Sequence, residues 1–359
     1  MQLPRKNRVT LSDVGEKCGV HRTTVGLALR NSPSIPPETK ARILKAAAEL
    51  GYRPDPALAS LVAYRHHKSD VNSYSTIALI SDSDYGARFW RSENHQTYWR
   101  GLYQGVLEQA TALGYQLQEF TVGTDRRHTR RISSILHARG ISAVIVTRIS
   151  NLVDPIELDW NRISAVSATY SLRAPAIPLV TTQHRANAYL AVNKLIEMGY
   201  RRIGLATVEE SDKRVDNAWT AGFLSACFSA RQLLSHHSIR MTTEKIDNGD
   251  LACQATLDWI HENRIESFLC TQQHVLPFLV RAGLKVPQDI GFAALDLPAE
   301  QGDVSGINQT PDAIGREAVN MISAMRAKNQ TGIPRFREIH LIRGVWRNGK
   351  TIRQPIAAE

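Results

Sequence analysis

The sequence has few cysteines and no long apolar run, and both shortages limit what the chain can be. Its 359 residues include four cysteines, scattered mostly in apolar settings: Cys18, Cys227, Cys253 and Cys270. This usage indicates buried thiols in a reducing compartment rather than a disulfide framework. No run of about 18 apolar residues occurs, and the basic N-terminus lacks the apolar segment of a secretion signal. We therefore expect a cytoplasmic protein with no membrane partner.

Signatures of enzymes and metal sites are also missing. The chain has no Gly-x-Gly-x-x-Gly, Walker A, Gly-x-Ser-x-Gly or His-Glu-x-x-His pattern. Two pairs of adjacent histidines occur, at 66–67 and 236–237. Adjacent side chains do not face one metal ion easily, and neither pair has a third ligand nearby in the sequence. The sequence predicts neither catalysis nor a bound metal or cofactor.

What the chain does have is a helix-turn-helix pattern at residues 9–31, reading VTLSDVGEKCGVHRTTVGLALRN. Thr10 is suited to cap a first helix, and Gly19 is suited to end it. A second helix follows from about Arg22, in which Val25, Ala28 and Leu29 form a buried face. Arg22, Thr23 and Leu27 then point elsewhere, as the side chains of a recognition helix do in a major groove.

A third helix and the distribution of charge support this interpretation. Two prolines precede a helical stretch at 38–50, and Gly51 ends it. Residues 1–70 contain 12 Lys and Arg against 6 Asp and Glu, a net charge of +6 out of +10 for the whole chain. A phosphate backbone would favour this concentration of positive charge. The alternative is a small helical bundle that touches another protein.

These residues resemble the DNA-binding headpiece of the LacI/GalR family of bacterial transcriptional regulators. The resemblance covers residues 9–63, through TLSDVGEKCGVHRTTVGLALRN and ETKARILKAAAELGYRPDPALASL. It departs from the family at two positions in or before the second helix. His21 stands where a serine usually caps that helix, and Gly26 replaces a small polar residue. Glycine there costs roughly 1 kcal/mol relative to alanine, or else allows a closer approach to the DNA backbone.

The resemblance implies two sets of DNA contacts in the headpiece. Base-reading contacts fall to Arg22, Thr23 and Leu27, since arginine pairs with guanine and leucine packs against a thymine methyl group. Phosphate contacts through hydroxyls and helix N-terminal amides fall to Thr10, Leu11, Ser12, Thr24, Ser34, Thr39 and Tyr52. Each hydroxyl could equally be an ordinary cap or a solvated group.

A short apolar stretch that could form a helix follows the headpiece. Its length of about two turns is below the roughly 12 residues that an isolated helix needs in water. In the family, such a hinge helix pairs with its twin in a dimer and inserts a leucine into the minor groove, and Leu58 and Leu61 match this element. The alternative is an ordinary linker with apolar residues. We expect a headpiece over 1–54 and a hinge helix with linker over 55–73.

From about residue 74 the pattern changes to alternating strands and helices, which predicts parallel α/β sheets buried on both faces. The expected strands are 76–81, 115–121, 143–147, 164–168, 202–206, 267–270 and 291–295. The expected helices are 98–113, 187–198, 219–230, 252–263 and 314–328. About 285 residues exceed what one hydrophobic core normally holds, so we expect two lobes.

This core, 74–359, resembles the family's pair of lobes, which are like periplasmic sugar-binding proteins, most clearly at MGYRRIGLAT and AGLKVPQDIGFAALD. The likeness implies crossings between the lobes near residues 171, 308 and 333. The N-lobe would then comprise 74–170 plus 309–332, and the C-lobe 171–308 plus 333–359. The fold class is thus an all-α headpiece joined by a hinge helix to a two-lobed α/β core.

Ligands of open α/β sheets bind at the carboxyl ends of strands, so the cleft between the lobes is the expected effector site. Polar or aromatic residues near strand ends could hold sugar hydroxyls and ring faces there. The candidates are Asp84, Trp99, Arg148, Arg214, Trp219, Gln272 and Asp296. Trp219 stands where many relatives have an arginine, and Gln272 where they have an acidic residue, so the lining carries less charge than in typical sugar-responsive members.

Together these features predict a transcriptional regulator, acting as a repressor associated with the nucleoid. It would bind a near-palindromic operator in double-stranded DNA as a homodimer, under control of a small-molecule effector such as a saccharide. Inducer and corepressor stay equally open. A second hypothesis is a cytoplasmic carbohydrate-sensing protein whose basic head binds a protein partner. A third is an enzyme that uses the cleft, although no nucleophile or acid–base pair stands out.

Overall fold

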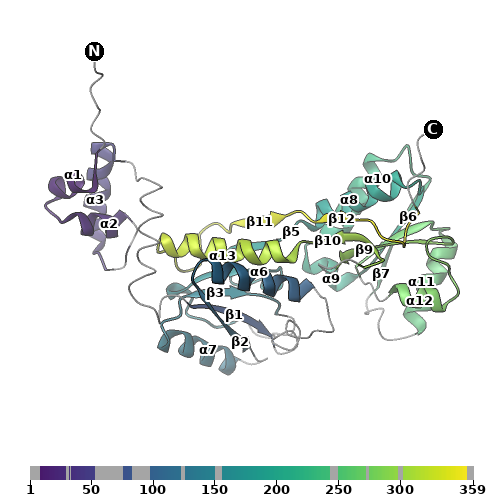
Figure 1. Cartoon of the computed structure of the whole chain (residues 1–359), viewed down its shortest axis with the longest axis horizontal. Coiled ribbons are helices and arrows are strands. Elements are labelled where there is room, and N and C mark those ends of the chain that lie inside the picture. Colours follow the sequence, from purple (N-terminus) through teal and green to yellow (C-terminus); the bar gives the residue numbers. More distant parts are fainter. Residues whose placement is uncertain are drawn as a thin grey trace, which may run out of the picture.

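A computed structural model gives the structure of the protein and describes residues 9–29, 32, 34–52, 76–82, 98–122, 126–149, 156–242, 250–271, 275–297 and 302–353. Figure 1 shows the headpiece, the two lobes and the element labels. Four of the residues proposed from the sequence lie outside the described residues: Leu58, Leu61, Asp84 and Gln272.

The headpiece consists of three helices around a small apolar core. They are α1 (Leu11–Cys18), α2 (Arg22–Leu29) and α3 (Pro37–Leu50). Thr10 caps α1 as predicted, in a reciprocal capping box with Asp13. Gly19 ends α1 in the left-handed conformation, with φ of 65°. Val14, Val25 and Ile43 are fully buried and hold the helices together.

The N-lobe is built on a six-stranded parallel sheet in the order β11-β5-β4-β3-β1-β2. Its strands are β1 (Thr76–Asp82), β2 (Gln116–Val122), β3 (Ala143–Val146), β4 (Ser164–Ser167), β5 (Leu179–Thr182) and β11 (Ile339–Ile342). Two helices, α6 (Tyr98–Ala112) and α13 (Pro311–Ala327), cover one face, and α7 (Arg126–Ala138) covers the other. A short 3₁₀ helix, η1 (Trp160–Arg162), precedes β4.

Alternate residues of the central strand β1 point to opposite faces of the N-lobe sheet. Ile77 and Leu79 pack under α6 and α13, whereas Ala78 and Ile80 pack against α7. Because both faces are covered, β1 is apolar along almost its whole length. α6 and α13 cross closely at Gly105 and Gly315, where added Cβ atoms would lie 2.0 and 2.3 Å from backbone oxygens of the other helix.

The C-lobe repeats this plan with the order β12-β10-β9-β8-β6-β7, and β12 alone among its described strands runs antiparallel to its neighbour. Its strands are β6 (Arg202–Val208), β7 (His236–Thr242), β8 (Ser267–Cys270), β9 (Gly291–Leu297), β10 (Ser305–Asn308) and β12 (Val345–Arg347). One face is covered by α8 (His184–Glu197) and α10 (Ala218–Ser229), and the other by α11 (Asp250–Glu262) and α12 (Val275–Arg281). α9 (Glu209–Arg214) follows β6.

The predicted fold class is confirmed, but two of the expected crossings between the lobes were placed too early. β5 and β11 both belong to the N-lobe sheet, so the chain leaves that lobe after Thr182 and after Ile342, not near 171 and 333. The reason is that β5 pairs with β4 only at Ser167 and Leu179, and β11 then pairs with β5. Buried Leu179 and Val180 extend the sheet beyond the end of β4.

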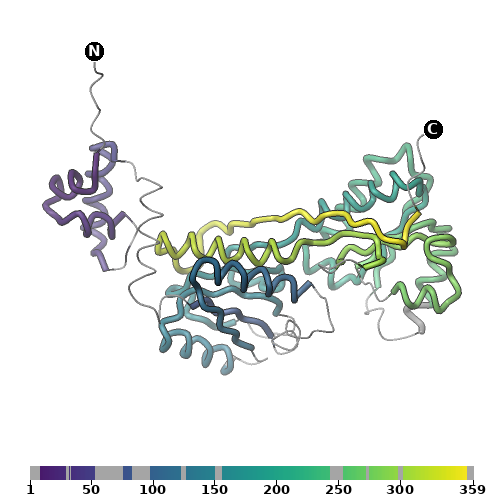
Figure 2. The backbone as a smooth tube through the Cα atoms, viewed as in Figure 1, coloured from purple at the N-terminus to yellow at the C-terminus, as the bar shows by residue number. Residues whose placement is uncertain are grey.

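The crossing segments are hydrogen-bonded to one another. The Asn187 side-chain amide donates to Thr182 Oγ1 at 2.8 Å, and its oxygen accepts the Gly344 N–H at 2.8 Å. The Thr310 hydroxyl lies 3.3 Å from the Arg343 carbonyl oxygen. Figure 2 shows the yellow C-terminal segment running from the N-lobe into the C-lobe beside these segments. The segments that connect the lobes are therefore hydrogen-bonded to one another and do not act as independent linkers.

Candidate functional site

The exposed face of α2 presents the residues proposed to read bases. Arg22 and Thr23 are exposed and Leu27 is half-buried, while Val25 and Ala28 face the headpiece core. Arg22 forms no ion pair with the residues that the structure describes, so its guanidinium is available to a ligand. α2 begins without the usual serine cap.

His21 takes over part of that capping role. Its Nδ1 accepts the Thr23 backbone N–H at 3.4 Å and lies 2.9 Å from Thr23 Oγ1. Nδ1 must be unprotonated to accept, which places the ring hydrogen on Nε2. The imidazole thus satisfies one free N–H at the start of α2 and fixes the Thr23 side chain beside Arg22.

Five of the seven residues proposed to hold phosphates lie at the N-terminal ends of the three helices: Thr10, Leu11, Ser12, Thr24 and Thr39. Leu11 and Ser12 open α1, Thr24 lies in the first turn of α2, and Thr39 in the first turn of α3. Free backbone N–H groups at such ends attract anions. Tyr52 packs partly buried beside the core, just after α3.

Two of these residues are already engaged within the headpiece. The Thr10 N–H and hydroxyl both donate to Asp13 Oδ2, at 2.6 and 2.8 Å, and these bonds hold the pKa of Asp13 below its usual value. The Ser34 hydroxyl lies 2.8 Å from that of Ser32. Both therefore hold local structure, and a phosphate would have to compete with these bonds.

In the core, the structure brings together three of the proposed effector residues from different elements of both lobes. Trp99 lies at the start of α6, Arg148 just after β3, and Asp296 near the end of β9. The Arg148 guanidinium lies 5.7 Å from the centroid of the Trp99 ring, within cation–π range. Tyr98 packs edge-on against Trp99 at 5.0 Å. We call Trp99, Arg148 and Asp296 the interlobe triad.

The charges of the triad are coupled across the lobes. Burial raises the pKa of Asp296 to about 6, and the positive charge of Arg148 opposes this rise. Burial also raises the pKa of Tyr98, and the negative charge of Asp296 adds to the effect. A carboxylate, a guanidinium and an indole face thus meet in a partly desolvated place, a combination that suits a polyhydroxylated ring.

The structure places Trp219 and Arg214 in other surroundings. Trp219 is only 5% exposed, lies in the C-lobe core cluster, and contacts the His184 ring edge-on at 4.6 Å. Arg214 pairs with Glu210 at 3.3 Å, one turn earlier in α9. Fully buried Asp212 accepts the Trp219 N–H at 3.0 Å and fixes the start of α10. The tryptophan that replaces the usual arginine is thus part of a packed aromatic group.

That aromatic group contains two residues that the sequence did not single out, Tyr170 and His184. Their rings lie 5.7 Å apart, and burial lowers the pKa of His184 to about 3, so it is neutral. The buried His184 Nδ1 has no hydrogen-bond partner among the described residues. Tyr170 lies three residues after the end of β4 and His184 two residues after the end of β5, and this position near strand ends is the signal that could have found them.

None of the described helices is long and apolar enough to span a membrane. Within the same residues, no group of three or more His, Cys, Asp or Glu side chains is placed to hold a metal ion.

Comparison with known proteins agrees with this geometry. Residues 10–55 match the model of bacterial regulatory proteins of the lacI family, and residues 192–345 match that of the periplasmic binding protein-like domain. The chain is 24% identical to the HTH-type transcriptional regulator CelR of Thermobifida fusca over 338 residues, covering 89% of this chain and 92% of that protein. It is 21% identical to the HTH-type transcriptional repressor PurR of Haemophilus influenzae (strain PittEE) over 341 residues, covering 92% and 95%.

Solved structures show the same fold. A complex of the transcriptional regulator CelR with cellobiose superposes with a TM-score of 0.59 at 20% identity, covering 96% of this chain and all of that one. The lac repressor dimer bound to operator and the anti-inducer ONPF gives 0.54 at 16% identity, covering 97% and 100%. The chain thus combines a helix-turn-helix domain of the lacI family with a periplasmic binding protein-like domain, and the relatives that it resembles are transcriptional regulators.

Proposed function

We propose that this protein is a sequence-specific transcriptional repressor. It binds a near-palindromic operator as a homodimer and is controlled by a saccharide held between its lobes. The observation that carries the proposal is the exposed face of α2, where Arg22 is unpaired among the described residues and Thr23 is fixed beside it by His21. In a major groove, arginine reads guanine through two hydrogen bonds, and Leu27 is suited to a thymine methyl group.

The helix N-termini of the headpiece support contacts to the DNA backbone. Ser12, Thr24 and Thr39 carry hydroxyls with no hydrogen bond to the described residues, and each lies in the first turn of its helix. Such groups position a module on the duplex without reading its sequence. Leu58 and Leu61, outside the described residues, complete the proposal as the minor-groove element of the hinge.

A homodimer follows from the need to place two headpieces on one operator. A two-fold protein matches a palindromic site, with half-sites about one helical turn apart or a multiple of that distance. The N-lobe leaves apolar side chains exposed on two elements that flank α13, namely Leu107 on α6 and Ile339 and Leu341 on β11. Burial of such side chains against a second copy would stabilise the dimer.

The effector proposal is supported by the interlobe triad. Asp296 can accept hydrogen bonds from sugar hydroxyls, Arg148 can donate to them, and Trp99 can stack on the C–H face of the ring. Because the triad draws on both lobes, its occupation would favour one arrangement of the lobes over another. Cellobiose is the first probe, since the CelR complex contains it.

The operator proposal is tested by selecting bound sequences from a random DNA pool with the purified protein at near-physiological salt. A recovered palindrome would support the repressor. Recovery of unenriched DNA, both without added ligand and with a panel of saccharides, would contradict it. It would favour the alternative of a basic head that binds a protein partner, which would also lack the steep salt dependence of phosphate binding.

The Arg22→Ala variant should lose preference at one base pair of each half-site. The expected cost is roughly 1–3 kcal/mol at the preferred base, because a bidentate contact to guanine is removed. Repeating the selection with the variant measures this change. Arg42→Ala is the matched control, since it removes the same charge from an exposed position on α3. Identical base preferences in the wild type and the Arg22 variant would remove Arg22 from the reading set.

A further inference from the structure

A basic surface lies at the edge of the N-lobe where the strands of its sheet begin. β1 begins there at Thr76, β3 at Ala143 and β4 at Ser164, as the parallel register shows. α7 and α13 run back along the sheet and end at the same edge. The Gly332 N–H donates to the Ile163 carbonyl at 3.1 Å, which places the end of α13 beside η1.

Four cations lie on the three chain segments that come together at this edge: Arg139, Arg162, Arg326 and Lys328. The segments 136–142, 159–163 and 325–332 contain one acidic residue, Asp159, so their net charge is +3. Arg139 and Lys328 are exposed, and they and Arg326 form no ion pair with the residues that the structure describes. We call these four residues the basic edge.

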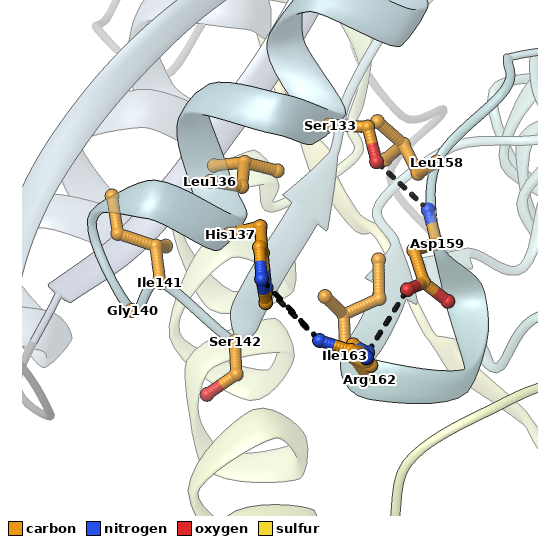
Figure 3. Close-up of a pocket in the computed structure, with 10 residues that line it drawn as sticks. All are labelled: Ser133, Leu136, His137, Gly140, Ile141, Ser142, Leu158, Asp159, Arg162 and Ile163. Carbon is orange, nitrogen blue, oxygen red and sulfur yellow. Dashed lines mark hydrogen bonds and ion pairs between the residues drawn. The ribbon is translucent and has the colours of Figure 1, made fainter.

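Arg162 is held in place by its neighbours. Figure 3 shows its guanidinium between Asp159 and His137, with distances of 3.1 Å to Asp159 Oδ2 and 3.2 Å to His137 Nδ1. The Ser133 hydroxyl in turn accepts the Asp159 N–H at 3.0 Å. The side chain of Arg162 is still 63% exposed. It therefore presents its charge to solvent in a restrained position, which lowers the entropy lost on binding an anion.

The pocket beside Arg162 does not account for this charge. The apolar part of its lining is formed by Leu136, Ile141, Leu158 and Ile163, and its volume is about 100 Å³. Pockets for small ligands are usually about 300–1,000 Å³. The dipoles of α7 and α13 stabilise cations at their C-terminal ends, but they do not neutralise them. The basic edge is thus a surface suited to an extended polyanion.

The basic edge lies where the chain from the headpiece enters the N-lobe. The headpiece joins the N-lobe through residues 53–75, which enter β1 at this edge. These residues span about 80 Å when fully extended and about 35 Å as a helix. The opposite edge of the lobe, where the strands end, faces the interlobe triad and is farther along the chain from the headpiece.

We propose that the basic edge contacts phosphates of the DNA that flanks each operator half-site. Salt screens charges beyond about 8 Å at physiological ionic strength, so the contribution requires close approach of the edge to the backbone. The contact adds affinity and salt dependence but no base preference. This proposal rests on the proposed operator binding. If the contact forms, the length of DNA that the dimer covers depends on how the N-lobes are oriented.

The test uses the full-length protein and two duplexes, one limited to the selected operator and one extended by a helical turn on each side. The triple variant Arg139→Gln, Arg162→Gln, Lys328→Gln is compared with the wild type over a salt series. We expect the magnitude of the slope of log K against log[salt] on the long duplex to fall by about 5, because three cations are removed from each of the two protomers, and affinity at low salt to fall about tenfold or more. Binding to the short duplex should not change.

The control variant Arg127→Gln, Arg131→Gln, Arg281→Gln removes the same charge from exposed positions elsewhere, and it should bind both duplexes as the wild type does. The double variant Arg139→Gln, Lys328→Gln breaks no described side-chain contact and therefore guards against misfolding. It should show about two thirds of the effect of the triple variant.

An unchanged slope on the long duplex, or an equal loss in the control, overturns the proposal. If the wild type binds neither duplex, the operator proposal fails with it, whereas short-duplex binding without the long-duplex effect refutes only the basic edge.

Discussion

Replacing Gly15 by valine should abolish operator binding while the two lobes stay folded. A Cβ on Gly15 would lie 2.6 Å from the Val20 carbonyl oxygen, closer than real Cβ contacts come, and 3.5 Å from Val25 Cγ2. The Val20 N–H donates to the Gly15 carbonyl at 2.9 Å, so the turn cannot move away without losing a bond. The extra valine carbons would then separate α1 from α2, which positions Arg22.

The effect should be large because the headpiece core is small. Overpacking a core costs about 1–3 kcal/mol, and a unit of this size has little stability in reserve. We expect at least a hundredfold loss of operator affinity, measured by fluorescence anisotropy, with the main thermal transition of the lobes unchanged. Glu16→Val is the control, because it places the same side chain at the next, exposed position of α1. Equal operator affinity for Gly15→Val and Glu16→Val would refute this account of the turn.

The headpiece was predictable from the sequence because its structure depends on short-range signals. The cap at Thr10, the break at Gly19 and the buried Val25 each follow from residues within one or two turns. His21 is the exception. The sequence showed only that a usual cap was missing, and the compensating bond to the Thr23 N–H required the imidazole geometry.

In the lobes, the central strands were predictable because they are continuous and apolar. The elements at the edges of the sheets were not. β1, β8 and β9 lie within two residues of their expected bounds. β5 follows two prolines, and β7, with the sequence HHSIRMT, is a partly exposed edge strand without an apolar run. α7 carries four arginines in its first six residues, and these masked its apolar face at Ile132 and Leu136. Edge elements depend on pairing partners far away in the sequence.

The residues of the candidate effector site also fall into a group that the sequence could predict and a group that it could not. Trp99, Arg148 and Asp296 each lie close to an element boundary that could be identified, so their convergence followed once the sheets were parallel. Trp219 was assigned through its position in the family pattern. Its burial against His184 depends on packing between α8 and α10, which no local pattern reveals.

The ionisation of Asp296 should control effector binding around pH 6. Two hydroxyl groups of a saccharide can donate to both oxygens only when the carboxyl is ionised. Because the pKa of Asp296 in the free protein is raised to about 6, saccharide affinity should rise about tenfold per pH unit below pH 6 and level off above it. Calorimetric titration between pH 5 and pH 8 measures this profile.

The Asp296→Asn variant should bind the saccharide with an affinity that is lower and independent of pH over this range. Each hydrogen bond to a charged group contributes about 1.5–3 kcal/mol, so the loss at pH 8 should be about tenfold to more than a hundredfold. Asp303→Asn, at an exposed position of the same lobe where the aspartate pairs with Lys350, should retain the wild-type profile.

Stability gives an independent measure of the same carboxyl. Because its folded pKa exceeds the ordinary value of 3.8, the native state binds more protons than the unfolded state between about pH 4 and pH 6. The contribution of Asp296 to stability is therefore present at low pH and is lost as the pH rises through 6, and the asparagine variant should lack this decline. A flat affinity profile in the wild type, together with an unchanged decline in the variant, would show that Asp296 is neither desolvated nor in contact with the effector.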